Sequence, residues 1–128
     1  MAAITAQRVL DENNYTVSDI PLANLEYLID NAIDHINSIT GLSMSNLTGL
    51  PESKTVTLTS AQAYVVKLLS ALMIRAYKDR GPNVNIGALG VTTIIADPQY
   101  RLFTKIIDRS ISALRSPPIY VSKDPVPT

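Results

Sequence analysis

Several residue types that often carry chemistry are absent or rare in this sequence. Its 128 residues include no cysteine, no tryptophan, one phenylalanine and a single histidine, His35. The absence of cysteine excludes disulfides, thiolate metal ligands and cysteine nucleophiles. A single histidine leaves no partner for a two-histidine metal site and does not indicate a Ser-His-Asp constellation. We therefore expect His35 to be a structural residue at the margin of a packed helix face.

Long hydrophobic runs are also lacking. The most apolar window, residues 63–77, is shorter than a membrane span and is interrupted by Lys67 and Arg75. The first residues do not combine a basic region with an apolar run, so no secretory signal is predicted. With 46% hydrophobic residues, the chain can bury a core without disulfides. These features predict a soluble protein with one globular domain.

The net charge is zero, but each half of the sequence is poor in charges of one sign. Residues 1–60 contain two basic and seven acidic residues, whereas residues 61–128 contain nine basic and four acidic ones. Opposite charges attract over a few ångströms, so acidic and basic helices could face one another within one subunit. Alternatively, identical subunits join acidic side to basic side. Such heterologous contacts make a ring when the rotation closes.

Apolar residues at helical spacing, flanked by capping signals, predict four helices. They are expected at residues 6–13, 21–40, 60–80 and 98–114. Thr5 suits the N-cap of the first helix, and Ser18 or Asp19 that of the second. Pro21 suits the first turn of the second helix, and Gly41 can take the left-handed conformation at its end.

The third and fourth predicted helices differ in their apolar surface. The third starts after Thr59 or Ser60 and is apolar around most of its circumference. Such a helix belongs in the middle of a bundle or against a neighbouring subunit. The fourth starts with Asp97 as N-cap and Pro98 at the first helical position. Its predicted buried face consists of Phe103, Ile106, Ile107, Ile111 and Leu114. Its basic face carries Arg101, Lys105 and Arg109.

Two segments outside the helices are expected to be irregular or extended. Residues 41–58 are rich in Ser, Thr, Gly and Pro, which predicts a loop. Residues 84–96 are apolar and β-branched, which predicts an extended arm or hairpin with a turn near residues 87–90. We expect its apolar residues to bind a partner protein; they are Val84, Ile86, Leu89, Val91, Ile94 and Ile95. A hairpin that covers its own bundle is the alternative.

The last thirteen residues, 116–128, contain four prolines and cannot be helical. The segment is expected to be extended and to dock on a partner through Pro118, Ile119, Tyr120 and Val121. A frayed terminus is the alternative. The predicted fold is therefore an all-α bundle of about four helices in residues 1–115, followed by an extended tail.

No catalytic, metal-binding or cofactor-binding residue is predicted. The glycines at positions 87 and 90 lack the following Lys-Ser/Thr of a phosphate-binding loop. Asp30 and Asp34, four residues apart, share a helix face, as an acid/base pair or a divalent-cation site requires. A solvated acidic face, or one that pairs with basic residues of another subunit, is the favoured interpretation. The predicted interface pairs Glu26, Asp30 and Asp34 with Lys67, Arg75, Arg101 and Lys105.

The order of these segments resembles the head-to-tail connector (adaptor, or head-completion) proteins of tailed bacteriophages. In that family the second helix commonly closes with an aromatic or aliphatic residue and Thr-Gly, matched here by residues 39–41. The third commonly ends in an aromatic residue, a charged or polar pair and an arginine, matched by residues 77–80. The resemblance covers residues 5–115. The last helix departs from the family pattern, because it starts at Asp97-Pro98 rather than Leu-Pro and is longer.

The resemblance implies a structural virion protein of the phage neck. Such a subunit forms a ring, expected to be dodecameric, that docks under the portal, extends the DNA channel and provides a platform for a stopper or tail protein. DNA would pass through the ring without sequence-specific binding. A small helical nucleic-acid-binding or regulatory protein is the alternative, because the basic face of the fourth helix could follow phosphates. An enzyme that uses Asp30 and Asp34 is a third, weaker hypothesis.

Overall fold

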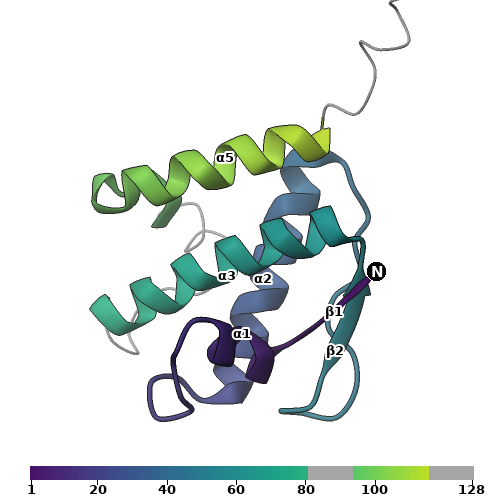
Figure 1. Ribbon diagram of the computed structural model, residues 1–128, viewed down its shortest axis with the longest axis vertical. Helices are drawn as coiled ribbons and strands as arrows, with labels where there is room; N and C mark the ends of the chain where they lie inside the picture. The colour runs from purple at the N-terminus through teal and green to yellow at the C-terminus, as the bar shows by residue number, and fades with distance from the viewer. Residues whose placement is uncertain (81–93, 116–128) are drawn as a thin grey trace, which may run out of the picture.

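The computed structural model describes residues 1–80 and 94–115 of the chain (Figure 1). In chain order the elements are strand β1 (Ala2–Thr5), helices α1 (Ala6–Glu12) and α2 (Leu22–Thr40), strand β2 (Thr55–Leu58), helix α3 (Ser60–Arg80), the 3-10 helix η1 (Pro98–Tyr100) and helix α5 (Arg101–Arg115). Residues 94–96 are also helical. The described part of the chain is mostly helical, as the sequence predicts.

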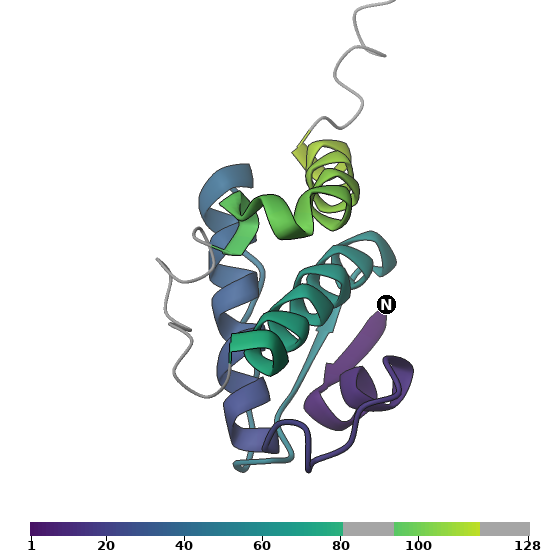
Figure 2. The ribbon, with the colours of Figure 1, turned by 90° about the vertical axis from the view of Figure 1, so that its left-hand side faces the viewer.

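Helix α3 lies at the centre of the bundle. It contacts α1, α2, α5 and both strands. In Figure 2, α2 forms one side of the molecule, and α1, α3 and α5 lie on the other. The nearly all-apolar surface of α3 is therefore covered largely by its own subunit. Of the two positions that the sequence allows, the middle of a bundle and a contact with a neighbouring subunit, α3 takes the first. None of the helices in the described ranges is long and apolar enough to cross a membrane.

A two-stranded sheet corrects the all-α prediction. Strand β1 pairs antiparallel with β2, with Ile4 opposite Val56. Val56 and Leu58 are buried, whereas Thr55 and Thr57 are exposed, which is the period-two pattern of a strand with one face on the core. Part of the predicted loop at residues 41–58 is therefore a strand. The pattern covers only four residues, and its partner lies about fifty residues earlier in the chain, so the local sequence does not reveal the pairing.

Most of the predicted caps are confirmed. Thr5 Oγ1 accepts a hydrogen bond from the Arg8 amide at 3.1 Å at the start of α1. At the start of α3, Thr59 and Gln62 bond each other reciprocally, at 3.2 and 3.3 Å, as a capping box does. Asp97 accepts from the Gln99 amide at 2.9 Å at the start of η1.

The start of α2 differs from the prediction. Its N-cap is Pro21, which supplies no side-chain hydrogen bond, so the expectation that Ser18 or Asp19 caps this helix is wrong. Asp19 instead accepts from the Thr16 amide at 2.8 Å and pairs with Lys78 of α3. Lys78 donates a hydrogen bond to this carboxylate, which lowers the pKa of Asp19 from its ordinary value. The loop before α2 is thus tied to α3, and Gly41 ends α2 with φ of 78°, as predicted.

The predicted partner-binding and tail segments are only partly within the described residues. Val84, Ile86, Leu89, Val91, Pro118, Ile119, Tyr120 and Val121 lie outside them. Ile94 and Ile95 lie within them, where Ile94 is 1% exposed and Ile95 packs against the core. The prediction that Ile94 binds a partner is therefore wrong, because its own bundle already removes it from water, whereas a partner contact of the half-buried Ile95 stays a prediction.

Ser70 in the middle of α3 offers a test of the packing. Its side chain is 0% exposed, and its hydroxyl has no hydrogen-bond partner among the described residues. An unpartnered buried polar group costs about 1–3 kcal/mol. We expect Ser70→Ala to raise the free energy of unfolding by about 1 kcal/mol, measured by urea unfolding. Ser38→Ala, on the exposed side of α2, is the control and should change it by no more than about 0.5 kcal/mol. A less stable Ser70→Ala variant would contradict this account of the hydroxyl.

Candidate functional site

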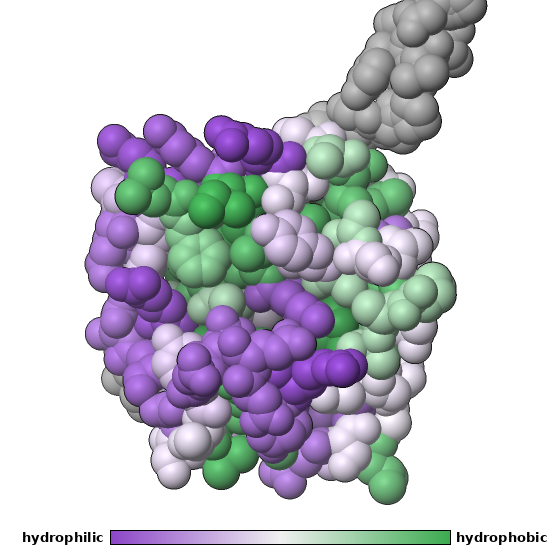
Figure 3. Space-filling model, in the orientation of Figure 1, coloured by the Kyte–Doolittle hydropathy of each residue, from purple (hydrophilic) through white to green (hydrophobic). Residues whose placement is uncertain are grey.

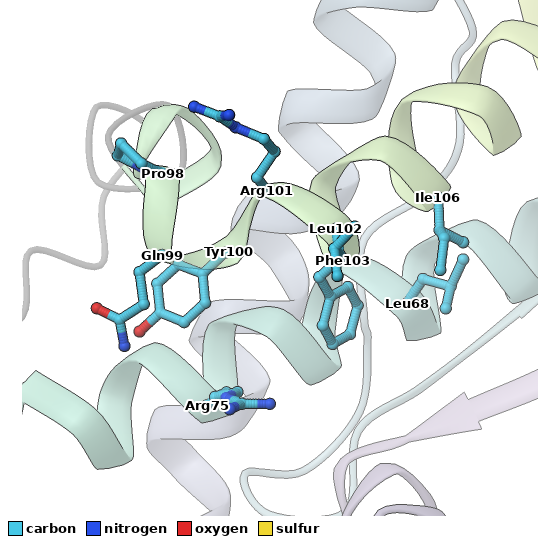
Figure 4. Close-up of a pocket in the computed structure, with 9 residues that line it drawn as sticks. All are labelled: Leu68, Arg75, Pro98, Gln99, Tyr100, Arg101, Leu102, Phe103 and Ile106. Carbon is cyan, nitrogen blue, oxygen red and sulfur yellow. The ribbon is translucent and has the colours of Figure 1, made fainter.

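A hollow lies between α3 and α5 on the described surface. It has a volume of about 610 Å³. Its wall consists of Leu68 and Arg75 from α3, Pro98, Gln99 and Tyr100 from η1, and Arg101, Leu102, Phe103 and Ile106 from α5 (Figure 4). We call this hollow the α3–α5 groove. It has the size of a site that binds a small molecule or the side chains of a partner protein.

The groove is largely apolar because α5 has more apolar positions than its contacts with α2 and α3 cover. Ile107 and Ile111, four residues apart, are 0% and 4% exposed and face the core. Leu102 and Ile106, also four apart, occupy the next face of the helix and are 78% and 50% exposed. Figure 3 shows the resulting apolar patch where α5 runs above α3. The prediction that Ile106 belongs to the buried face is therefore wrong for the single subunit.

The apolar surface continues along α3 beyond the groove. Tyr64 is 55% exposed and lines two smaller hollows, of about 360 Å³ and 220 Å³. The larger of these shares Leu68 and Phe103 with the groove. Contiguous exposed apolar side chains are typical of surfaces that bind another molecule. The sequence patterns did not predict Tyr64, Leu68 or Leu102 as candidate residues. One feature of the sequence could have indicated this surface: the apolar stripe on the last helix is wider than one buried face.

Basic side chains border this apolar surface. The guanidinium groups of Arg75 and Arg101 make no hydrogen bond or ion pair with other residues of the described ranges. In Figure 4, Arg101 extends away from α3, whereas Arg75 rises from α3 below the groove. Lys67 differs, because its ammonium pairs with Glu12 of α1 at 3.3 Å. Two arginines therefore remain available to an acidic partner, while the predicted role of Lys67 in a subunit contact competes with an internal pair.

Glu26 corrects the predicted acidic interface. Its side chain is 3% exposed. One carboxylate oxygen accepts from the Glu52 amide at 2.9 Å, and the other accepts from the Lys54 amide at 2.9 Å. Both oxygens thus hold the turn before β2 inside the subunit. A buried carboxylate with these partners cannot reach a neighbouring subunit, so Glu26 no longer belongs to the predicted interface.

Asp30 and Asp34 continue the row that Glu26 begins on α2. Asp30 accepts from the Leu47 amide at 2.9 Å, and Asp34 accepts from the side-chain amide of Asn46 at 3.0 Å. Three acids at successive i, i+4 positions therefore bind the segment that runs back along α2. No group of three or more potential metal-binding side chains occurs within residues 1–80 and 94–115. Asp30 is partly buried and Asp34 is exposed, so a contact to a second subunit stays a prediction for them.

The single histidine lies at the edge of a packed face, as expected. His35 is partly buried on α2, near Asp108 of α5. Burial lowers the pKa of His35 from its ordinary value of 6.5, and the negative charge of Asp108 opposes this effect. The histidine therefore favours its neutral form in the folded protein and connects α2 to α5 electrostatically.

This pKa shift predicts a pH dependence of stability. Because the folded-state pKa is lowered, the unfolded chain takes up a proton first as the pH falls. The stability from neutral His35 is complete above about pH 6.5 and is lost as the pH falls through the lowered pKa. His35→Gln should flatten the pH dependence of the free energy of unfolding between about pH 5 and 7. Asp108→Asn should steepen it, since the opposing charge is removed. An unchanged profile in His35→Gln, measured by urea unfolding at each pH, would contradict this assignment.

The chain matches no protein-family model, and neither curated proteins nor solved structures show a match to it.

Proposed function

We propose that this chain is a non-enzymatic assembly protein that forms a ring in the neck of a tailed bacteriophage. The ring, expected to contain twelve subunits, docks under the portal protein, extends the DNA channel and provides the platform for a stopper or tail-completion protein. The observation that carries the proposal is the α3–α5 groove, where Leu102 and Ile106 stay exposed on a subunit that buries a full core elsewhere. Exposed apolar surface beside unpaired arginines is typical of a protein that binds other proteins.

The identity of the assembly comes from the family resemblance. Residues 39–41 and 77–80 carry the helix endings that are common among connector proteins. In the structure these segments end α2 and α3, the positions that the resemblance requires of them. The acid row on α2 supports a structural rather than catalytic role, because Asp30 accepts a backbone amide of the loop that it holds.

The proposal is tested on capsids. DNA-filled heads from a phage that lacks this protein should bind the purified chain, and electron microscopy should show a ring at the portal vertex. Native mass spectrometry of the heads' neck complex should give the number of subunits. Heads that bind no protein, or that gain tails equally well without it, would exclude a neck function.

A nucleic-acid-binding protein is the second candidate, and the outer side of α5 favours it. Arg101, Lys105 and Arg109 are exposed at successive i, i+4 positions, and their side chains make no ion pair within the described residues. If all three contact phosphates, the logarithm of the binding constant for duplex DNA should fall with the logarithm of salt concentration with a slope of about −3. Charge reversal of the three residues should remove this slope. Ring formation with no measurable DNA affinity would favour the neck protein instead.

A further inference from the structure

The turn before β2 presents an exposed leucine on a rigid support. Leu50 is 77% exposed. Its carbonyl accepts a hydrogen bond from the Ser53 amide at 2.9 Å, which closes a tight turn. The two carboxylate oxygens of Glu26 accept hydrogen bonds from the Glu52 and Lys54 amides, which fix the rest of the turn. Leu50 is therefore an apolar side chain whose backbone is already ordered, so its docking on a partner costs little conformational entropy.

An acidic residue shares the turn with this leucine. Glu52, in the same turn, is exposed, and its carboxylate has no hydrogen bond or ion pair within the described ranges. We call Leu50 and Glu52 the Leu50 knob. An exposed leucine beside an unpaired carboxylate complements, in hydrophobicity and in charge, an apolar groove bordered by two unpaired guanidinium groups of the described residues.

We infer that the Leu50 knob of one copy of this chain docks in the α3–α5 groove of the next copy, with Glu52 facing Arg75 or Arg101. The occupant of the groove is thus a second copy, and the inference rests on the proposed ring. The inference specifies which two surfaces form the interface between neighbouring subunits of that ring.

The positions of the two surfaces exclude a contact within one subunit. The knob lies beside the first turns of α2, because Glu26 holds it there. Helix α5 packs near the other end of α2, where Asp108 approaches His35 (Figure 1). The two surfaces lie toward opposite ends of the subunit, so knob and groove cannot meet within one molecule. A contact between two different surfaces that is not reciprocated within one pair of subunits is heterologous and propagates head to tail, which produces a ring when the rotation closes.

Two matched variants test the inference. Leu50→Asp removes the knob and Leu102→Asp alters the groove, at side chains that are 77% and 78% exposed. Both changes are compatible with the fold, because both side chains are exposed and aspartate is favoured in the first turn of a helix, where Leu102 lies. Val17→Asp is the control, since Val17 is 52% exposed and belongs to neither surface. Circular dichroism and thermal melting should confirm that all three variants fold.

The expected results come from sedimentation velocity and native mass spectrometry at low salt. Wild type and Val17→Asp should associate, whereas Leu50→Asp and Leu102→Asp should each raise the dissociation constant at least about tenfold. An equimolar mixture of Leu50→Asp and Leu102→Asp should form heterodimers with the wild-type dissociation constant but nothing larger. Each such dimer contains one intact knob and one intact groove. A two-fold dimer with two reciprocal contacts would be rescued only in part, because the heterodimer keeps one of the two.

Several outcomes would overturn the inference. These are wild-type protein that stays monomeric at its highest soluble concentration, a mixture that stays monomeric, and variants that associate like wild type. Loss of association in Leu102→Asp alone would mean that another segment, such as residues 116–128, occupies the groove. The proposed function fails separately, when wild-type protein does not bind DNA-filled heads. If both variants still form rings on heads, the neck function stands and this interface is wrong.

Discussion

Replacing Glu26 with alanine is expected to lower the free energy of unfolding by about 3 kcal/mol or more. The side chain is 3% exposed, and its two oxygens accept the Glu52 and Lys54 amides at 2.9 Å. Hydrogen bonds to a charged group contribute about 1.5–3 kcal/mol each, and alanine leaves both amides without an acceptor. Urea unfolding followed by circular dichroism measures the change. Asp34→Ala is the control on the same helix, because this aspartate is exposed and bonds only an asparagine side chain.

The same variant separates stability from assembly. Because Glu26 orders the turn that carries Leu50, Glu26→Ala should also weaken self-association of the protein that remains folded. Glu26→Gln keeps one acceptor oxygen but places an amide donor opposite the second backbone amide, so its loss of stability should be intermediate. A Glu26→Ala protein as stable as Asp34→Ala would show that the turn does not depend on this carboxylate.

Replacing Ile107 with alanine is expected to cost about 2–5 kcal/mol of unfolding free energy, whereas Ile106→Ala should cost less than about 1 kcal/mol in the isolated subunit. The two isoleucines are adjacent, but Ile107 is 0% exposed and Ile106 is 50% exposed. Truncation of a buried isoleucine loses its transfer free energy and leaves a cavity, whereas truncation at the groove does neither fully. Thermal and urea unfolding of the two variants under conditions where the protein is monomeric provide the comparison.

The effects of the two variants on self-association should have the opposite order. Ile106 lines the groove, so Ile106→Ala should weaken association of subunits more than it changes their stability. Equal losses of stability in the two variants would mean that α5 is rotated relative to the packing described here, with Ile106 in the core.

Local sequence patterns placed the helices well, because their determinants are local. Thr5, Thr59 and Asp97 cap helices that begin next to them, and a cap acts only on backbone amides two or three residues away. The same holds for Gly41, whose left-handed conformation ends α2. The apolar stripe of α2 could also be predicted, since residues three and four apart share one face of any helix.

The candidate site could be predicted only in part. The basic residues Arg75 and Arg101 were expected at a contact surface, and both border the groove. Glu26 was expected there as well, but its burial follows from a turn 26 to 28 residues away that folds back onto α2. A charged residue on an amphipathic helix is normally assigned to solvent, and no local pattern shows that distant backbone amides will cover it.

The tertiary structure alone decided which apolar residues are left for a partner. A helix stripe as wide as that of α5 offers both Ile106 and Ile107 to the core, and the crossing of α5 over α3 selects Ile107 and leaves Ile106 in the groove. The pairing of β1 with β2 is likewise a contact between segments that are far apart in the chain. Hydrogen bonds within three or four residues can be predicted from sequence, since they repeat in every helix. Burial depends on where two elements cross, and that position is set by the packing of the whole core.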